Sequence, residues 1–179
     1  MNYSECIIKA KDRIGKFCKA CPECNGRACK NQMPGPGSKG IGDTAVRNYD
    51  KWKEIRVQMD TIAENKPVDT SLELFGKTFC YPVFAGPVGA VSLHYGDCLD
   101  DVAYNDILVS ACAENGIAAF TGDGVDSNVM VAATAAIKKA GGVGIPTVKP
   151  WNLETIREKM ELVHESGAFA VAMDIDAAG

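Results

Sequence analysis

Four cysteines crowd into a short loop near the N-terminus, at a spacing that suits metal binding. They are Cys18, Cys21, Cys24 and Cys29, in the pattern C-x2-C-x2-C-x4-C. This spacing is close to the ferredoxin run, in which thiolates hold an iron–sulfur cluster. Four thiolates also bind zinc, although zinc ligand pairs are usually separated by a longer spacer. The loop therefore predicts a metal site, either iron–sulfur or zinc, with a group of reduced, unliganded thiols as the alternative.

Later in the chain, a second set of chemical groups lies at the carboxyl ends of two predicted strands. Because side chains alternate along a strand, Thr147 and Lys149 share one face, as do Asp174 and Asp176. If these faces meet, Lys149 pairs with an aspartate of the neighbouring strand. Such a pair either satisfies buried charge or provides a cation that stabilises an anionic ligand. The position at the carboxyl ends of strands favours the ligand role, because ligands bind at that edge of parallel sheets.

Short apolar runs alternate with helical segments over the second half of the chain. Each predicted helix has a polar start and a glycine stop. The helices are expected over 101–114, from 126 or 127 to 141, and from 152 to 167, between strands at 82–86, 117–121, 145–149 and 168–174. This rhythm predicts a parallel sheet with right-handed crossovers.

Two parallel architectures fit this rhythm, a doubly wound sheet and a barrel. The turn after the first strand lacks the three-glycine dinucleotide fingerprint. A predicted hairpin, with strands at 72–75 and 78–81 around Gly76-Lys77, precedes that strand like a plug at the bottom of a barrel. The sequence therefore predicts an α/β fold, the first four strands of a TIM (β/α)8 barrel, preceded by an N-terminal helical, cysteine-rich extension.

The predicted domain boundary follows the Gly- and Pro-rich segment at 33–42. Residues 1–45 form the N-terminal helix and the cysteine-rich Gly/Pro loop, and residues 46–179 form the half-barrel. A helix is expected over 48–64, where apolar residues recur at helical spacing. Because the chain stops at the fourth strand, we expect a half-barrel that is completed by a C-terminal half-barrel or by a homo-oligomer through its open sheet edges.

Composition places the chain among globular proteins. It has 179 residues, 46% hydrophobic and 23% charged, with a net charge of −4. No apolar run spans a bilayer and no signal-peptide pattern opens the chain, so we expect a cytoplasmic protein without a membrane partner. Basic side chains gather in the first 56 residues, but no aromatic residues interleave with them to stack bases. We therefore expect no nucleic-acid partner, and interpret the basic residues as counter-charge to thiolates.

Several segments between residues 45 and 179 resemble the FMN-dependent α-hydroxy-acid oxidase/dehydrogenase family, which includes glycolate oxidase and lactate dehydrogenases of this type. The hairpin and the strand that follows it match the family's order of motifs. One segment upstream is similar to a further family motif, and one segment downstream resembles a helix entry of the family. The matching segments are 69–77, 81–90, 47–52 and 94–97. The resemblance rests on the order and spacing of these motifs together.

The resemblance implies an oxidoreductase that binds FMN at the strand ends and oxidises a 2-hydroxy acid to a 2-oxo acid. The implied cofactor-binding residues are Pro87, Val88, Gly89, Thr121, Gly122, Thr147, Lys149 and Asp174, and Lys149, Asp174 and Asp176 are candidate contributors to catalysis. Lys149 stands where the family usually has Tyr, so the substrate is left open. The cysteine loop is not part of the resemblance.

The resemblance also implies that the family's base His, substrate-binding Arg and phosphate site come from strands five to eight. Neither His94 nor His164 stands in for that base. We therefore expect residues 1–179 to be inactive alone. Two other functions stay open: a non-catalytic half-barrel binding or assembly module, and a fragment of a flavin isomerase like type 2 isopentenyl-diphosphate isomerase.

Overall fold

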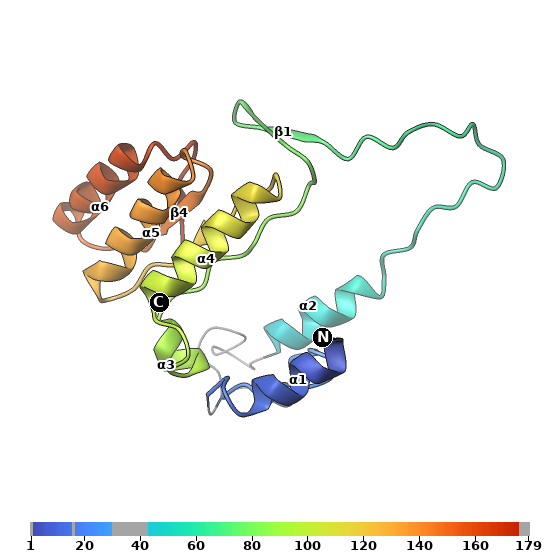
Figure 1. The fold of residues 1–179 in the computed structure, drawn as a ribbon, viewed down its shortest axis with the longest axis horizontal. Helices are drawn as coiled ribbons and strands as arrows, with labels where there is room; N and C mark the ends of the chain where they lie inside the picture. The colour runs from blue at the N-terminus through green and yellow to red at the C-terminus, as the bar shows by residue number, and fades with distance from the viewer. Residues whose placement is uncertain (1, 16, 30–42, 176–179) are drawn as a thin grey trace. The chain divides into compact units, whose positions relative to one another are not determined.

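The computed structural model describes residues 2–15, 17–29 and 43–175. They form two compact units, one of residues 1–67 and 92–98, the other of residues 68–91 and 99–179. The ribbon of Figure 1 follows the chain through both. The Gly/Pro segment predicted at 33–42 lies outside the described residues, and the domain boundary at 45/46 stays a prediction. Nowhere in the described chain is a helix both long enough and apolar enough to cross a membrane.

The first unit contains α1 (Tyr3–Lys11) and α2 (Thr44–Trp52). α1 begins with a capping box, in which Asn2 and Glu5 each bond the other's backbone N–H. α2 ends at Trp52, so the helix expected over 48–64 is wrong beyond that residue. The apolar side chains that suggested it, such as Met59 and Ile62, are 80% and 97% exposed. Because helices gain most of their stability from packing an apolar face, periodicity alone did not extend this one.

A β-hairpin opens the second unit. β1 (Leu72–Leu74) pairs antiparallel with β2 (Lys77–Phe79), and Leu74 lies opposite Lys77. The two loop residues, Phe75 and Gly76, have φ of 50° and 75°, as a type I′ turn requires. The hairpin prediction is confirmed, but the turn lies one residue earlier than expected.

A parallel sheet follows, formed by β3 (Phe120–Thr121), β4 (Ile145–Val148) and β5 (Ala172–Met173) in that order. The segment predicted as the first strand contributes a parallel bridge from Ala85 to Ala119, beside β3. The predicted parallel order is therefore confirmed, although each segment pairs over fewer residues than expected. The sheet is open, and a half-barrel is not established by these strands.

Helices connect the successive strands. They are α3 (Val91–Tyr95), α4 (Asp101–Glu114), α5 (Ser127–Lys139) and α6 (Leu153–Ser166). Asp126 caps α5, Asn152 caps α6, and Gly167 ends α6 in the left-handed region, as predicted. α3 was not predicted from the sequence.

α4, α5 and α6 cover the same face of the sheet, with α5 between the other two (Figure 1). On this face, Val148 of β4 packs with Met130 of α5 and Val163 of α6. Side chains alternate along β4, so Thr147 and the following Lys149 lie on the opposite face. Barrels carry their helices on one face of the sheet, whereas doubly wound sheets carry helices on both faces.

Two loops at the carboxyl edge of the sheet approach each other through backbone. A Cβ on Gly122, after β3, would overlap the backbone of Val88 and lie 2.5 Å from the N atom of Gly89. A Cβ on Gly89 would lie 2.9 Å from the carbonyl O of Asp123. The absence of side chains at these two glycines therefore sets the spacing between the loops.

We expect Gly122→Ala to lower the free energy of unfolding by about 1–3 kcal/mol, because the added methyl group overpacks against a backbone that cannot rotate away. Gly86→Ala is the matched control, since a Cβ there meets nothing within 4 Å, and we expect a change within about 0.5 kcal/mol. Urea denaturation measures both variants. Equal stabilities would show that the two loops are not in contact.

Candidate functional site

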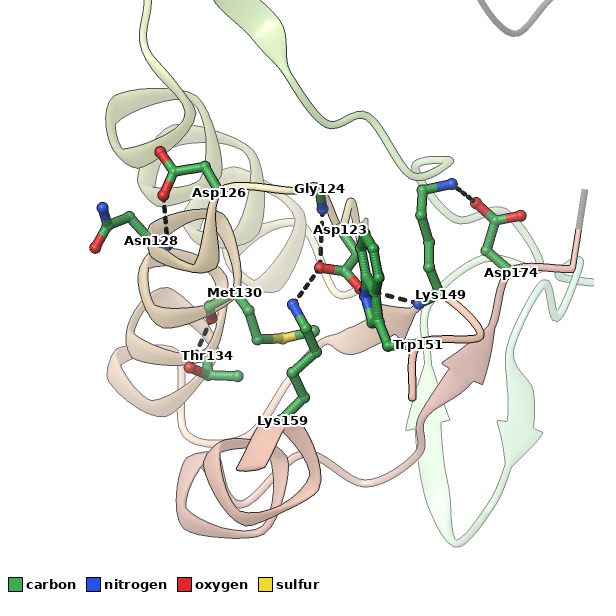
Figure 2. Close-up of polar contacts among 10 residues, drawn as sticks. All are labelled: Asp123, Gly124, Asp126, Asn128, Met130, Thr134, Lys149, Trp151, Lys159 and Asp174. Atoms are coloured by element: carbon green, nitrogen blue, oxygen red, sulfur yellow. Dashed lines mark hydrogen bonds and ion pairs between the residues drawn. The ribbon is translucent and has the colours of Figure 1, made fainter. Parts of the chain in front are cut away.

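The carboxyl edge of β4 carries a cation paired with the neighbouring strand. Lys149 Nζ lies 2.6 Å from Asp174 Oδ2, and the two side chains are 28% and 27% exposed (Figure 2). The N–H of Asp174 donates to the carbonyl O of Val148, which continues the β4–β5 ladder to this point. The predicted meeting of Lys149 with an aspartate is thus confirmed as geometry. Its role in binding stays a prediction, and Asp176 lies outside the described residues.

Thr147 places a buried hydroxyl on the same face of β4 as Lys149. Thr147 is 4% exposed, and its Oγ1 has no hydrogen-bond partner among the described residues. A buried hydroxyl without a partner is costly and uncommon in folded proteins. Such an atom, on the same strand face as a cation at the edge where ligands bind, fits a position that a bound ligand satisfies.

Thr121 also has a buried hydroxyl with no partner among the described residues. However, Thr121 pairs with Pro146 across the parallel ladder, and paired residues face the same side. Pro146 precedes Thr147 and therefore faces the other side of the sheet. The two threonine hydroxyls do not converge on one site.

The sequence assigned no role to Asp123 at the end of its strand, yet its carboxylate joins several elements of this site (Figure 2). Oδ1 accepts from the N–H of Gly124 at 2.8 Å and from Lys159 Nζ at 2.7 Å. Oδ2 accepts from the N–H of Lys149 at 2.9 Å and from Trp151 Nε1 at 2.7 Å. One carboxylate thus connects the β3 exit, the β4 exit and α6.

Lys159 is the charged partner of Asp123, and the two side chains are 7% and 0% exposed. Its ammonium also lies 5.5 Å from the centre of the Trp151 ring, within range of a cation–π contact. A signal for this pair existed in the sequence. Lys159 shares the buried stripe of α6 with Val163 and Ser166, and a lysine in such a stripe calls for a buried acid.

Burial and hydrogen bonding act on the pKa of Asp123 in opposite directions. Burial alone raises that pKa, because it disfavours the charged form. Donation from the Lys149 N–H, the Lys159 ammonium, the Trp151 indole and the Gly124 N–H outweighs burial and lowers the pKa below its usual value. The carboxylate is therefore ionised at neutral pH.

The predicted cofactor residues at the first strand exit, Pro87, Val88 and Gly89, lie in the loop that contacts Gly122. Their backbone is thus at the carboxyl edge, beside the β3 exit. The two histidines lie elsewhere, His94 in α3 and His164 on α6.

The cysteine loop gathers its thiols without forming a recognisable metal centre. Burial raises the pKa of the Cys24 thiol, and the charges of Cys29, Cys18 and Cys21 raise it further. The N–H of Ala20 donates to Cys18 Sγ at 3.4 Å. Among the described residues, however, no group of three or more His, Cys, Asp or Glu side chains is placed to hold a metal ion. The structure therefore does not support the predicted iron–sulfur or zinc site.

The groups on the Lys149 face fit the polar edge of an isoalloxazine ring. That edge carries carbonyl oxygens and an N–H. These groups match an ammonium and the Thr147 hydroxyl, whose Oγ1 has no partner within the part of the chain that the structure describes. The glycine-spaced loops supply backbone at the same edge of the sheet. Thr147 and Lys149, with the loop at 87–89, stay the predicted FMN contacts at this edge.

A parallel α/β sheet with polar groups at its carboxyl edge defines the class of α/β proteins that bind ligands at that edge. A family profile described as FMN-dependent dehydrogenase matches residues 36–179. The chain belongs to the FMN-dependent dehydrogenase family, which confirms the resemblance seen in the sequence. No curated protein matches the chain.

We expect acid to remove the stability that the Asp123 carboxylate provides. A pKa lowered by folding contributes stability above the unfolded value, about 4, and loses it as pH falls through the folded value. Asp123→Asn should cost about 3–5 kcal/mol near neutral pH, because it leaves the buried Lys159 ammonium without its counter-charge. The difference from wild type should narrow as pH falls below about 4.

Urea denaturation over this pH range measures the free energy of unfolding of wild type and of Asp123→Asn. Asp106→Asn is the control, because it removes an exposed ion pair with Lys139 and should change stability by less than about 1 kcal/mol. A gap between wild type and Asp123→Asn that stays constant with pH would contradict a lowered pKa.

Proposed function

We propose that this chain contributes the first four strands of a TIM barrel in an FMN-dependent oxidoreductase that converts a 2-hydroxy acid to a 2-oxo acid. Membership of the FMN-dependent dehydrogenase family supports the cofactor. The observation that carries the proposal is the Lys149 ammonium at the carboxyl edge of the sheet, on the same face of β4 as the buried Thr147 hydroxyl. One-sided helices support the barrel.

In this proposal the substrate loses two electrons and two protons, and its C–OH becomes C=O. FMN, when bound, supplies the two-electron acceptor for this oxidation. Lys149 provides positive charge for an anionic carboxylate or for the reduced flavin, at a position where Asp174 holds it. The Thr147 hydroxyl donates to or accepts from the ring edge.

Residues 1–179 alone should not turn over substrate. Removal of the hydroxyl proton calls for a general base within hydrogen-bond reach, and both histidines lie on helices, not at strand exits. We propose that a C-terminal half-barrel supplies that base and continues the sheet beside β5. The alternative is that two copies of the chain pair through this edge. Gel filtration distinguishes the two, because paired copies elute as a dimer.

We expect Lys149→Met to weaken FMN binding by the full-length protein about tenfold, because hydrogen bonds to charged groups contribute about 1.5–3 kcal/mol. Fluorescence titration of FMN measures the affinity. Lys139→Met is the matched control, as Lys139 is an exposed lysine paired with Asp106, and should leave affinity unchanged.

Anaerobic addition of short 2-hydroxy acids should then bleach the bound flavin of the wild-type protein. Flavin that binds but is not reduced by any 2-hydroxy acid would contradict the proposed substrate class. Failure of the full-length protein to bind FMN would contradict the proposal itself.

We propose separately that the cysteine loop takes up a metal when one is supplied. The support is the sequence spacing of the four cysteines, C-x2-C-x2-C-x4-C from Cys18 to Cys29. Protein purified without oxygen should contain iron with acid-labile sulfide, or zinc without sulfide. Cys24→Ser should lose that metal, and Cys6→Ser, at an exposed cysteine in α1, should keep it. Metal-free protein with four freely reactive thiols would contradict the proposal.

A further inference from the structure

One oxygen of Asp123 holds both ends of the turn that follows β4. Oδ2 accepts from the N–H of Lys149 at 2.9 Å and from the indole N–H of Trp151 at 2.7 Å. Between them, the N–H of Trp151 donates to the carbonyl O of Lys149 at 2.8 Å, which closes a three-residue turn over Pro150. The Lys149–Trp151 segment is therefore fixed at its first and last residues.

The other oxygen anchors this turn to the rest of the unit. Oδ1 accepts from the N–H of Gly124 in its own loop and from Lys159 Nζ on α6. Both side chains of the Asp123–Lys159 pair are buried, and α6 packs against β4 through Val163 and Val148. The turn is thus tied to the loop after β3 and to a packed helix.

The Lys149 side chain leaves this fixed turn on the opposite face of β4, toward Asp174 (Figure 2). A lysine side chain has four rotatable bonds, and holding it in one geometry costs conformational entropy. Because the backbone of Lys149 is fixed, its ammonium can occupy fewer positions. The 2.6 Å contact with Asp174 is then maintained from both sides, by the turn and by the acid.

We propose that Asp123 is a positioning residue, which fixes the β4 exit so that Lys149 presents its ammonium to an anionic ligand on the face of β4 that also carries Thr147. It acts from the helix-covered side of the sheet and does not touch that ligand. This proposal rests on the proposed function in one respect, which is that the ligand is FMN or a 2-hydroxy acid. The placement of Lys149 is tested without either.

Two double variants separate positioning from stability. Both carry Lys159→Met, which removes the buried ammonium and retains apolar bulk. Asp123→Asn with Lys159→Met keeps an oxygen that accepts from Lys149 and Trp151. Asp123→Leu with Lys159→Met fills a similar space without an acceptor. Replacement of a buried ion pair by neutral or apolar residues is often tolerated, so urea denaturation should find both variants folded.

The readout is the rate at which acetic anhydride acetylates Lys149, followed by peptide mass spectrometry on the full-length protein. A lysine released from its ion pair reacts faster. We expect the Asp123→Leu double variant to acetylate about two- to fivefold faster at Lys149 than wild type, the range that a partly exposed ion pair provides. The Asp123→Asn double variant should react like wild type. Lys139, in its own exposed pair, is the internal reference.

Equal Lys149 rates in wild type and in a folded Asp123→Leu double variant would overturn the proposal. If that variant does not fold, Trp151→Phe replaces it, because the change removes one donor to Oδ2 and keeps an aromatic ring. A rise at Lys149 in Trp151→Phe supports the proposal, and an unchanged rate overturns it. Failure of wild type to bind FMN contradicts the proposed function alone, because acetylation needs no flavin.

Discussion

The buried carboxylate of Asp123 is the interaction on which the carboxyl edge of the sheet depends. Removing an ionised carboxylate from water is expensive unless charge and hydrogen bonds replace the lost hydration. Here two backbone N–H groups, one indole N–H and one ammonium do so, from three different elements. The requirement to satisfy one anion therefore fixes the relative positions of the β3 exit, the β4 exit and α6.

β4 separates this structural charge from the Lys149 charge on its other face. Val148 faces the helices with Met130 and Val163, whereas Thr147 and Lys149 face the other way, where Lys149 meets Asp174. Strand alternation produces this separation from adjacent residues. An enzyme gains from such an arrangement, because charges aimed at a ligand act best when their positions are fixed before binding.

Local signals in the sequence were enough for the helices of the second unit. Their caps at Asp126 and Asn152 and the stop at Gly167 depend on a few neighbouring residues. Strand lengths were less predictable, because pairing depends on distant partners. Asp123 was missed for the same reason, since its donors Trp151 and Lys159 lie 28 and 36 residues away. The apolar spacing around Met59 predicted a helix, but the Met59 side chain is exposed and no helix forms there.

If a ligand occupies the proposed site, the Thr147 hydroxyl links ligand binding to the amount of folded protein. A buried polar atom without a partner destabilises the fold by about 1–3 kcal/mol, a large fraction of the margin by which small domains remain folded. A ligand that bonds to Oγ1 removes this penalty and adds its own mass-action stabilisation. Cells starved of riboflavin would then contain less of the protein, since the empty form would be unfolded and degraded more often.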